Sequence, residues 1–460
     1  MEKKIPIAIL IQLKDLILRV DIANKKCFAD IIFHMFPDFE LPEITGLSID
    51  SRNIKPGDIF LPLKGNSFNG HQFIPEAESK GASIALIEDA IETSLPTYRV
   101  GPTKTFLYDI IYKYRQKLNY PFIGITGSNG KTTTKELLSH VLSSKLDVVC
   151  TKGNYNSTTG APLSVLDFNE NADIAIIEIG ANKPGEIEMI CKIIKPEMGI
   201  ITNISEAHLS NFGSINEIAK TKSALFTSLP PHGIAFINLD DPLISTMNVS
   251  CSRIEYSLNT TADYQGEWND TTKILNLNGV LIRLKSYPKT MSINSLAVYS
   301  IASELGCSTE SIIDQIQSFQ IPNGRGDIIK VGNYTIINDC YNANYDSAKL
   351  GINNLSEIPW SGRKITIMGD MLELGSKEKI YHKQLGYHLI KNKVDAVFAY
   401  GNLSKYTIEA MDGSNIFHKF YSDKNLLVDH LKEYLNEGDI IYIKGSRNMK
   451  MEDIIKGLEY

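Results

Sequence analysis

The stretch Gly124–Lys135, GITGSNGKTTTK, places small and hydroxyl residues around Lys131. It follows the apolar run PFI and precedes the helix-like segment ELLSHVLSS. A glycine-rich turn between a strand and a helix presents backbone N–H groups to an anion at the positive end of the helix dipole. The usual spacing is GxxxxGK[ST], and here Gly124 lies one residue further out. The stretch predicts a phosphate-binding loop in which Lys131 reaches terminal phosphates and the Thr132 hydroxyl can ligate magnesium.

Apolar runs and helix-like segments alternate after this loop. The runs ADIAIIE, MGIITNI and GIAFINL are separated by GEIEMICKII and SINEIAKTKSALFTSL, which predicts a mostly parallel sheet covered by helices. The segment KILNLNGVLIRL carries an Asn-Gly turn and predicts a hairpin. A second alternation, from KITIMGD to MEDIIKGL, has no phosphate loop. We therefore expect an α/β protein with a smaller α/β N-terminal domain (1–101), a central domain with a mostly parallel sheet (102–321) and a Rossmann-like C-terminal domain (322–460).

Composition limits the class of protein. The chain has 460 residues, 43% of them hydrophobic and 22% charged, with a net charge of -6. An acidic balance without a basic stripe argues against binding to nucleic acid. No run approaches the roughly 18 apolar residues of a membrane span, and polar residues interrupt the N-terminal segment at helical spacing, which predicts an amphipathic helix. The six cysteines are widely spaced, so we expect reduced packing residues in a cytoplasmic protein that does not insert into a membrane.

Two further residues follow apolar strands at the edge where the phosphate loop is expected. Glu178 ends the run ADIAIIE, and the carboxyl ends of parallel strands are where ligands gather. Glu178 is therefore a candidate magnesium ligand. His208, in TNISEAHLSNFG, follows the next strand at the corresponding edge. It is either a second metal ligand or an ordinary loop histidine.

These segments resemble those of the ATP-dependent Mur ligases, which build the peptide of the bacterial cell-wall precursor. TGSNGKTT (126–133) is similar to the family's ATP loop and GNYNSTTGAP (153–162) to its substrate loop, while EIGA and NISEAHLSNFGS resemble its metal-binding segments. The similarity continues through Gly324-Arg325, DCYNANYDS, GDMLELG and KGSR. Residues 50–65 resemble a uridine-binding start. YNAN with GDMLELG, in a chain without the DNPR segment of tripeptide ligases, favours a member that joins D-alanyl-D-alanine to a UDP-N-acetylmuramoyl tripeptide.

The resemblance implies a role for each matching position. The implied ATP-binding residues are Gly127, Ser128, Asn129, Gly130, Lys131, Thr132, Thr133, Asn294, Arg325 and Asp339. The implied magnesium ligands are Thr132, Glu178, His208 and Lys222, with Lys222 matching a lysine that the family carbamylates. Lys131, Glu178, His208 and Lys222 form the implied catalytic set. The implied substrate-binding residues are Ser51, Asn66, Asn154, Asn156, Asn342, Asn344 and Arg447.

Some of these residues have a plainer interpretation from the sequence alone. Lys220 and Lys222 would form a solvated helix face, and Asn342, Asn344 and Arg447 would be turn-forming asparagines and a surface arginine. The chain also departs from the family pattern at four positions. These are Ser157 for an asparagine, Met291 within the expected His-Asn pair, Ala224 for a glutamate and Tyr345 for a proline.

The implied reaction is amide formation through an acyl phosphate, with ATP and Mg²⁺ as cofactors. The N-terminal domain would bind the UDP end of the tripeptide and the central domain ATP. The C-terminal domain would deliver D-alanyl-D-alanine and Arg325 to the site of a monomeric enzyme. Two alternatives stay open. One is another amide ligase of the family, such as a tripeptide or folylpolyglutamate synthase, and the other is a nucleotide-switched binding protein that uses the loop only for conformational control.

Overall fold

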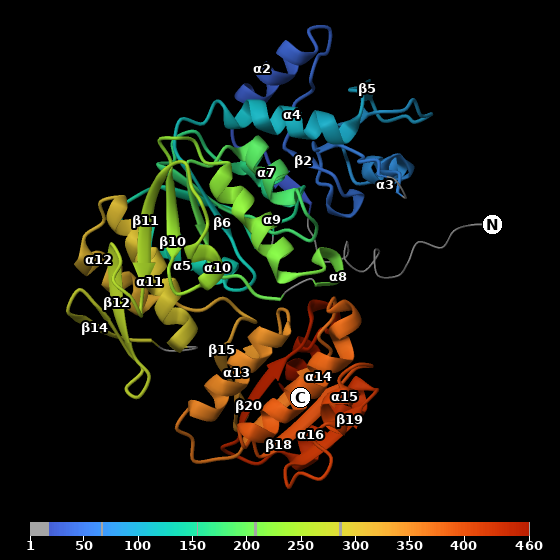
Figure 1. Ribbon diagram of the computed structural model, residues 1–460. Coiled ribbons are helices and arrows are strands. Elements are labelled where there is room, and N and C mark those ends of the chain that lie inside the picture. Colours follow the sequence, from blue (N-terminus) through green and yellow to red (C-terminus); the bar gives the residue numbers. More distant parts are fainter. Residues whose placement is uncertain (1–17, 66–67, 154, 207–208, 285–287, 460) are drawn as a thin grey trace.

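The computed structural model describes residues 18–65, 68–153, 155–206, 209–284 and 288–459. In this part of the chain the strands form three sheets, of five, nine and six strands. The sheets follow one another in sequence and lie one after another along the molecule, coloured blue, teal to yellow, and orange to red in Figure 1. The N-terminal helix expected over the first 20 residues falls largely outside the described residues, and at its end Arg19 and Val20 belong to a strand instead.

The N-terminal sheet has the order β1-β2-β3-β4-β5 and is parallel apart from the β1–β2 pair. Its strands are β1 (Arg19–Asp21), β2 (Gly46–Ser48), β3 (Ile59–Phe60), β4 (Ile84–Ile87) and β5 (Thr97–Arg99), and its helices are α2 (Lys25–Met35) and α3 (Ile74–Ser79). A buried ion pair joins the first strand to the turn before β3, because Arg19 Nε lies 2.6 Å from Asp58 Oδ2. Helix α4 (Thr103–Arg115) leads from this sheet to the central one.

The central sheet has the order β14-β13-β12-β11-β10-β9-β6-β8-β7 and is parallel from β7 to β12. Its strands are β6 (Phe122–Thr126), β7 (Val148–Cys150), β8 (Ile174–Glu178), β9 (Met198–Ile201), β10 (Ile234–Asn238), β11 (Ser252–Ser257), β12 (Tyr264–Asn269), β13 (Ile274–Leu277) and β14 (Val280–Arg283). The predicted hairpin is β13–β14, and Asn278 and Gly279 both have positive φ, as a tight two-residue turn requires.

Helices cover both faces of this sheet, because successive side chains along its strands point into two different hydrophobic cores. In β8, Ile174 and Ile176 face one core while Ala175 and Ile177 face the other. The helices of the central domain are α5 (Lys131–Leu142), α6 (Gly160–Leu163), α7 (Glu186–Ile194), α8 (Leu209–Phe212), α9 (Ile215–Thr227), α10 (Pro242–Ser245), α11 (Pro288–Glu304) and α12 (Thr309–Ser318). Helices α5, α11 and α12 pack on one face, and α4, α7 and α9 on the other.

The C-terminal sheet has the order β15-β16-β20-β17-β18-β19, with only β15 antiparallel. Its strands are β15 (Asp327–Val331), β16 (Tyr334–Asp339), β17 (Lys364–Gly369), β18 (Ala396–Tyr400), β19 (Phe417–Tyr421) and β20 (Ile440–Lys444). Its helices are α13 (Tyr345–Glu357), α14 (Glu378–Lys391), α15 (Lys405–Glu409), α16 (Lys424–Tyr434) and α17 (Glu452–Glu459). The expected Rossmann-like, mostly parallel architecture is confirmed.

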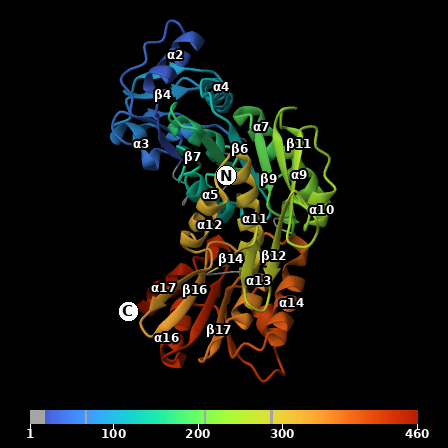
Figure 2. The same ribbon diagram turned by 90° about the vertical axis from the view of Figure 1, so that its left-hand side faces the viewer.

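The C-terminal domain contacts the central domain near the ends of β12–β14 and α11, as both ribbon views show (Figures 1 and 2). Lys273, just before β13, forms an ion pair with Glu357 of α13. All six cysteines lie in the described residues and none forms a disulfide. Within the described ranges, no helix combines the length and apolar character needed to cross a lipid bilayer.

Candidate functional site

The predicted phosphate loop joins the end of β6 to the start of α5, as the sequence indicates. Gly127 has φ 151°, and a Cβ there would lie 1.9 Å from Thr202 Oγ1. Gly130 has φ 79°, and a Cβ there would lie 3.4 Å from Asn294 Nδ2. No side chain caps the N-terminus of α5. The first helical N–H groups are therefore left for a ligand, which is the arrangement that binds phosphate.

The loop borders a cavity of about 470 Å³ between the central and C-terminal domains. Most of the predicted site residues line it: Gly127, Ser128, Asn129, Gly130, Lys131, Thr133, Asn156, Glu178, Lys222, Asn294, Arg325, Asp339, Asn342, Asn344 and Arg447. Lys131 Nζ donates to Gly127 O (2.9 Å) and Ser128 O (3.3 Å). Burial lowers the Lys131 pKa, and the charge of Glu178 partly opposes this effect.

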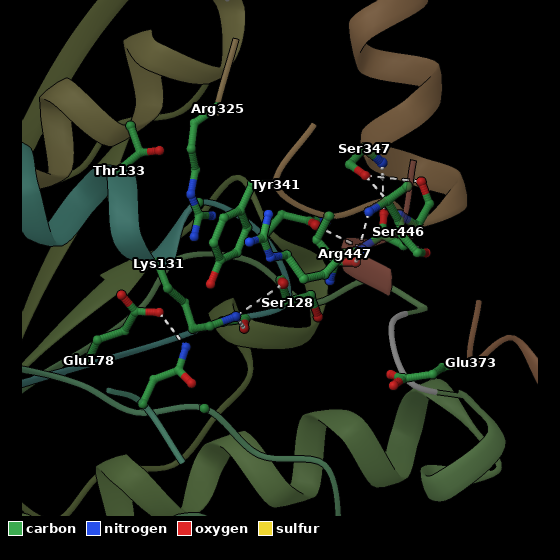
Figure 3. Close-up of a pocket in the computed structure, with 18 of the residues that line it drawn as sticks. Ser128, Lys131, Thr133, Glu178, Arg325, Tyr341, Ser347, Glu373, Ser446 and Arg447 are labelled. Carbon is green, nitrogen blue, oxygen red and sulfur yellow. Dashed lines mark hydrogen bonds between the residues drawn. The ribbon is translucent and has the colours of Figure 1, made fainter. Parts of the chain in front are cut away.

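Glu178 is 1% exposed at the end of β8, beside Lys131 in Figure 3. Its two carboxylate oxygens accept from uncharged donors, the Thr132 hydroxyl (2.8 Å) and the Asn156 side-chain amide (2.7 Å). Among the described residues, no ammonium or guanidinium lies within ion-pair distance of this carboxylate. A buried carboxylate without a cationic partner is costly, and a bound cation would relieve that cost. Glu178 and Thr132 therefore fit a magnesium site.

Lys222 lies on α9 and is 5% exposed, whereas Lys220 on the same helix is exposed. The interpretation of both lysines as a solvated helix face is wrong for Lys222. Burial, with a smaller effect from the nearby charge of Lys131, holds the Lys222 pKa well below its usual value. Among the described side chains, none hydrogen-bonds to Lys222 Nζ. A lowered pKa favours the neutral amine, which is the form that can take up carbon dioxide, so the environment of Lys222 fits a carbamylated lysine.

The described residues include no group of three or more His, Cys, Asp or Glu side chains that could hold a metal ion. This finding leaves the magnesium prediction open, because its proposed donors include a hydroxyl and a carbamylated lysine. The fourth predicted ligand, His208, lies outside the described residues, as do Asn66 and Asn154. Ser51 lies in the N-terminal domain, where its hydroxyl donates to Glu76 Oε2 (2.7 Å), and it is not part of the cavity lining.

Two residues of the C-terminal domain reach across the cavity to the loop. Arg325 stacks on the Tyr341 ring, with its guanidinium carbon 3.7 Å from the ring centroid, and donates to Thr132 Oγ1 (2.8 Å). Figure 3 shows Arg325 and Tyr341 side by side next to Lys131. The Asn344 side-chain amide donates to Asn129 Oδ1 (2.8 Å). Asn344 also caps α13 by accepting from Ser347 N–H, which agrees with the plainer interpretation of Asn344 as a residue that shapes the local chain, and its role in binding substrate stays a prediction.

The sequence interpretation missed Lys444, which organises this side of the cavity. Lys444 is 2% exposed and donates to Asp339 Oδ2 (2.6 Å) and to Asn342 O (2.9 Å). Asn342 Oδ1 accepts from the Arg447 backbone N–H (3.3 Å), and the Arg447 side chain lies 2.8 Å from Glu452 Oε1. The segment KGSR resembles the family pattern, but the resemblance implies a role only for its arginine. A lysine at the end of a buried strand was the signal for Lys444.

Two of the four departures from the family pattern line the cavity. Ser157 and Met291 line it, and the Ser157 hydroxyl accepts from Gly160 N–H (3.0 Å), which shapes the turn before α6. Tyr345 stacks on Tyr381 of α14, with ring centroids 4.7 Å apart. Ala224 is half-buried on α9. Thus Ser157 and Tyr345 each make a local contact of their own.

A nucleotide loop, a buried carboxylate opposite it and an arginine from a second α/β domain define an ATP-dependent ligase of the Mur type. Residues 43–116 match the Mur ligase family catalytic domain, residues 125–302 the Mur ligase middle domain, and residues 324–447 the Mur ligase glutamate ligase domain. The chain belongs to the Mur ligase family.

Individual relatives narrow the comparison. The chain is 33% identical over 439 residues to the UDP-N-acetylmuramoyl-tripeptide–D-alanyl-D-alanine ligase of Bacillus subtilis, covering 92% of this chain and 94% of the relative. It resembles a crystal structure of MurF from Acinetobacter baumannii with a TM-score of 0.81 at 26% identity, over 94% and 98% of the two chains. It also resembles MurF from Thermotoga maritima in complex with ADP, with a TM-score of 0.78 at 26% identity, over 90% and 96%.

Proposed function

We propose that this chain joins D-alanyl-D-alanine to a UDP-N-acetylmuramoyl tripeptide, using ATP and releasing ADP and phosphate in the synthesis of peptidoglycan precursor. The observation that carries the proposal is the placement of Lys131, Glu178 and Arg325 around one cavity between two domains. Two relatives, from Bacillus subtilis at 33% identity and from Buchnera aphidicola at 35% identity, are UDP-N-acetylmuramoyl-tripeptide–D-alanyl-D-alanine ligases that match about nine-tenths of this chain, which supports the choice of substrates. The ADP complex of the Thermotoga maritima protein supports ATP as the nucleotide.

The chemistry requires an activated carboxylate. The terminal carboxylate of the tripeptide does not acylate an amine at neutral pH, because its oxygen is a poor leaving group. Transfer of the ATP γ-phosphoryl group to that oxygen gives an acyl phosphate, from which the amine of the dipeptide displaces phosphate. In this scheme Lys131 and the α5 N-terminus hold the phosphates, and Arg325 approaches from the other domain. A magnesium ion, when bound, would neutralise phosphate charge in the transition state.

The remaining roles belong to the same proposal. Thr132, Glu178, His208 and carbamylated Lys222 would hold magnesium, and Asn294 and Asp339 would contact the nucleoside. Asn156, Asn342, Asn344 and Arg447 would contact substrate, while Ser51 would help to bind the uridine end, together with Asn66 and Asn154. The proposed boundaries are 1–101, 102–321 and 322–460. We also propose a monomer that works in the cytoplasm.

The decisive experiment measures phosphate release from ATP with both substrates, with each omitted in turn, and with neither. We expect release only when a UDP-muramoyl tripeptide and D-alanyl-D-alanine are both present. Release that ignores both substrates would indicate a nucleotide switch. If phosphate is released with an amino acid in place of the dipeptide, the enzyme is a different amide ligase of the family. Mass spectrometry of the product then verifies that one dipeptide has been added.

A further inference from the structure

Lys135 is a second lysine of α5, one helical turn after Lys131, and the proposed reaction gives it no role. Its side chain is fully buried. Its ammonium donates to Thr151 O (2.6 Å) and Gly153 O (3.4 Å) and lies 2.7 Å from Glu136 Oε1. Both carbonyls belong to residues 151–160, which follow β7 and contain most of the substrate loop predicted over residues 153–162. From here on, the substrate loop means residues 151–160.

A buried ammonium is tolerated only where acceptors satisfy it. Lys135 has three N–H donors, and these two carbonyls and the Glu136 carboxylate supply three acceptors. Both carbonyls lie beyond the end of β7, and Gly153 turns the chain with φ 54°. Among the described residues, no backbone N–H donates to either carbonyl. Lys135 therefore supplies hydrogen bonds that strand pairing does not.

The same loop is fastened a second time, to the end of β8. The Glu178 backbone N–H donates to Thr151 Oγ1 (3.0 Å), and the Asn156 side chain donates to Glu178 Oε1 (2.7 Å). The Gly180 N–H donates to Asn156 O (2.7 Å). The described residues on either side of Asn154 are thus held between the phosphate-loop helix and the strand that carries Glu178.

We propose that Lys135 is a positioning residue that fixes the substrate loop relative to the phosphate loop. Lys131 and Lys135 are four residues apart, so both project from one face of the same rigid helix. Lys131 serves the phosphates, and Lys135 holds Thr151 and Gly153, at the start of the substrate loop, against the same helix. Lys135 contacts no reacting atom, and the proposal rests on the function proposed above. Misplacing a substrate by about 1 Å can cost about 100-fold in rate, so a tie of this kind affects turnover.

The test compares Lys135→Met, which keeps an unbranched side chain one atom shorter and removes the ammonium, with Lys135→Arg. The matched control is Lys145→Met. The Lys145 ammonium also donates a hydrogen bond to a backbone carbonyl, that of Gly306, but Lys145 is exposed and does not line the cavity. Four quantities are measured for each variant. They are kcat, KM for the UDP-linked tripeptide, Kd for a non-hydrolysable ATP analogue, and amide hydrogen exchange across residues 151–160.

For Lys135→Met we expect KM for the UDP substrate to rise at least about tenfold and kcat to fall, with the analogue Kd within about twofold of wild type. Amide exchange should quicken in the substrate loop and stay unchanged in the C-terminal domain. Lys135→Arg should recover part of the loss, because a guanidinium can reach the same carbonyls. Lys145→Met should match wild type in all four measurements.

The proposal is overturned if Lys135→Met leaves KM and loop exchange unchanged. It is also overturned if KM and the analogue Kd worsen together with general acceleration of exchange, because that result describes a loss of stability alone. If Lys135→Met does not fold, Lys135→Gln, which keeps an amide donor, is measured in its place under the same criteria. A wild-type protein that fails the two-substrate assay refutes the proposed function instead, and the loop-exchange measurement still decides the role of Lys135.

Discussion

At the scale of single residues, Lys131 already lies where a phosphate would need it, bonded to the carbonyls of the loop it ends. Replacing these weak neutral acceptors by phosphate oxygens would strengthen its hydrogen bonds. We expect Lys131→Ala to lose several kcal/mol of transition-state stabilisation, on the order of 10³-fold in turnover. Phosphate release under saturating substrates measures the loss, and Lys220→Ala, at an exposed lysine, is the control. If Lys131→Ala kept wild-type turnover, the assignment of this loop as the phosphate-binding loop would be wrong.

A side chain at Gly127 would destabilise the protein in two ways, by backbone strain and by steric overlap. A Cβ at Gly127 meets both a positive φ of 151° and Thr202 Oγ1 at 1.9 Å, whereas Gly101, with φ 77°, has no atom within 4 Å of that position. Gly101→Ala should therefore destabilise the protein by about 1 kcal/mol, from backbone strain alone. Gly127→Ala should cost a further 1–3 kcal/mol or so and weaken nucleotide binding. Urea unfolding of both variants tests this, and equal losses would refute the steric argument.

The loop was predictable from sequence because glycine, lysine and hydroxyl residues at fixed spacing have few other uses. The environment of Lys222 was not predictable without the family resemblance. Lys220 and Lys222 are two residues apart, and the helical pattern alone does not show which one turns inward. The decision depends on packing of α9 against the central sheet, which involves residues far away in the chain. In the same way, nothing local shows that Lys444 meets Asp339 of another strand.

At the scale of elements, the segment GDMLELG forms one wall of the cavity and is held from behind by a buried histidine. His382 of α14 accepts from the Met371 N–H at Nε2 (3.0 Å), and its Nδ1 lies 2.7 Å from the Glu378 carbonyl. Nδ1 therefore carries the proton and donates to that carbonyl, while Nε2 must stay unprotonated. Burial lowers the His382 pKa, although its hydrogen bond to Glu378 and the charge of Asp370 oppose the shift.

This arrangement predicts a pH dependence of stability. The unfolded chain takes up a proton on this histidine below about pH 6.5, whereas the folded chain does so only at lower pH. Because the unfolded state then binds more protons, the free energy of unfolding falls as pH is lowered through this window. Replacing His382 by Gln should reduce the slope of the free energy of unfolding against pH by the equivalent of at most about one proton. The variant should also be less stable overall. Urea unfolding between pH 7 and 5 measures the slope, and an unchanged slope would contradict the prediction.

The sequence predicted elements with strong periodicity and missed those without it. Helices α7 and α9 lie where the patterns indicate, and Ser214 caps α9 by accepting from Glu217 N–H. Strands β11 and β12, with sequences SRIEYS and YQGEWN, were not predicted. Both are rich in polar and charged residues because they extend the sheet beyond its buried centre, and only the neighbouring strand identifies them. The antiparallel pair β15–β16 was also not predicted, although most of β16 is buried.

At the scale of the whole molecule, the site exists only while the central and C-terminal domains lie together. Side-chain contacts between described residues cross the boundary near the cavity. Arg325 contacts Thr132, Asn344 contacts Asn129, and Lys377 Nζ lies 3.1 Å from Glu206 Oε1. The first two end on residues of the phosphate loop, so nucleotide binding and domain closure act on the same few atoms. Closure of this kind excludes water from a reactive intermediate.

These contacts should differ widely in their effect on turnover, although all of them bridge the domains. Lys377 and Glu206 form an exposed pair, with side chains 46% and 29% exposed. Such pairs contribute about 0–1 kcal/mol, so Lys377→Ala should lower turnover by less than about fivefold, and added salt should mimic it.

Arg325 faces the cavity, where a guanidinium can stabilise charge on a transferring phosphoryl group. Arg325→Ala should therefore lose at least about 10²-fold in kcat, with little salt dependence, while the Kd of an ATP analogue changes much less. Phosphate release at several ionic strengths, with X-ray scattering to measure the separation of the domains, tests both variants. If the two variants lose the same activity and open the molecule equally, Arg325 serves closure alone and its charge has no part in the reaction.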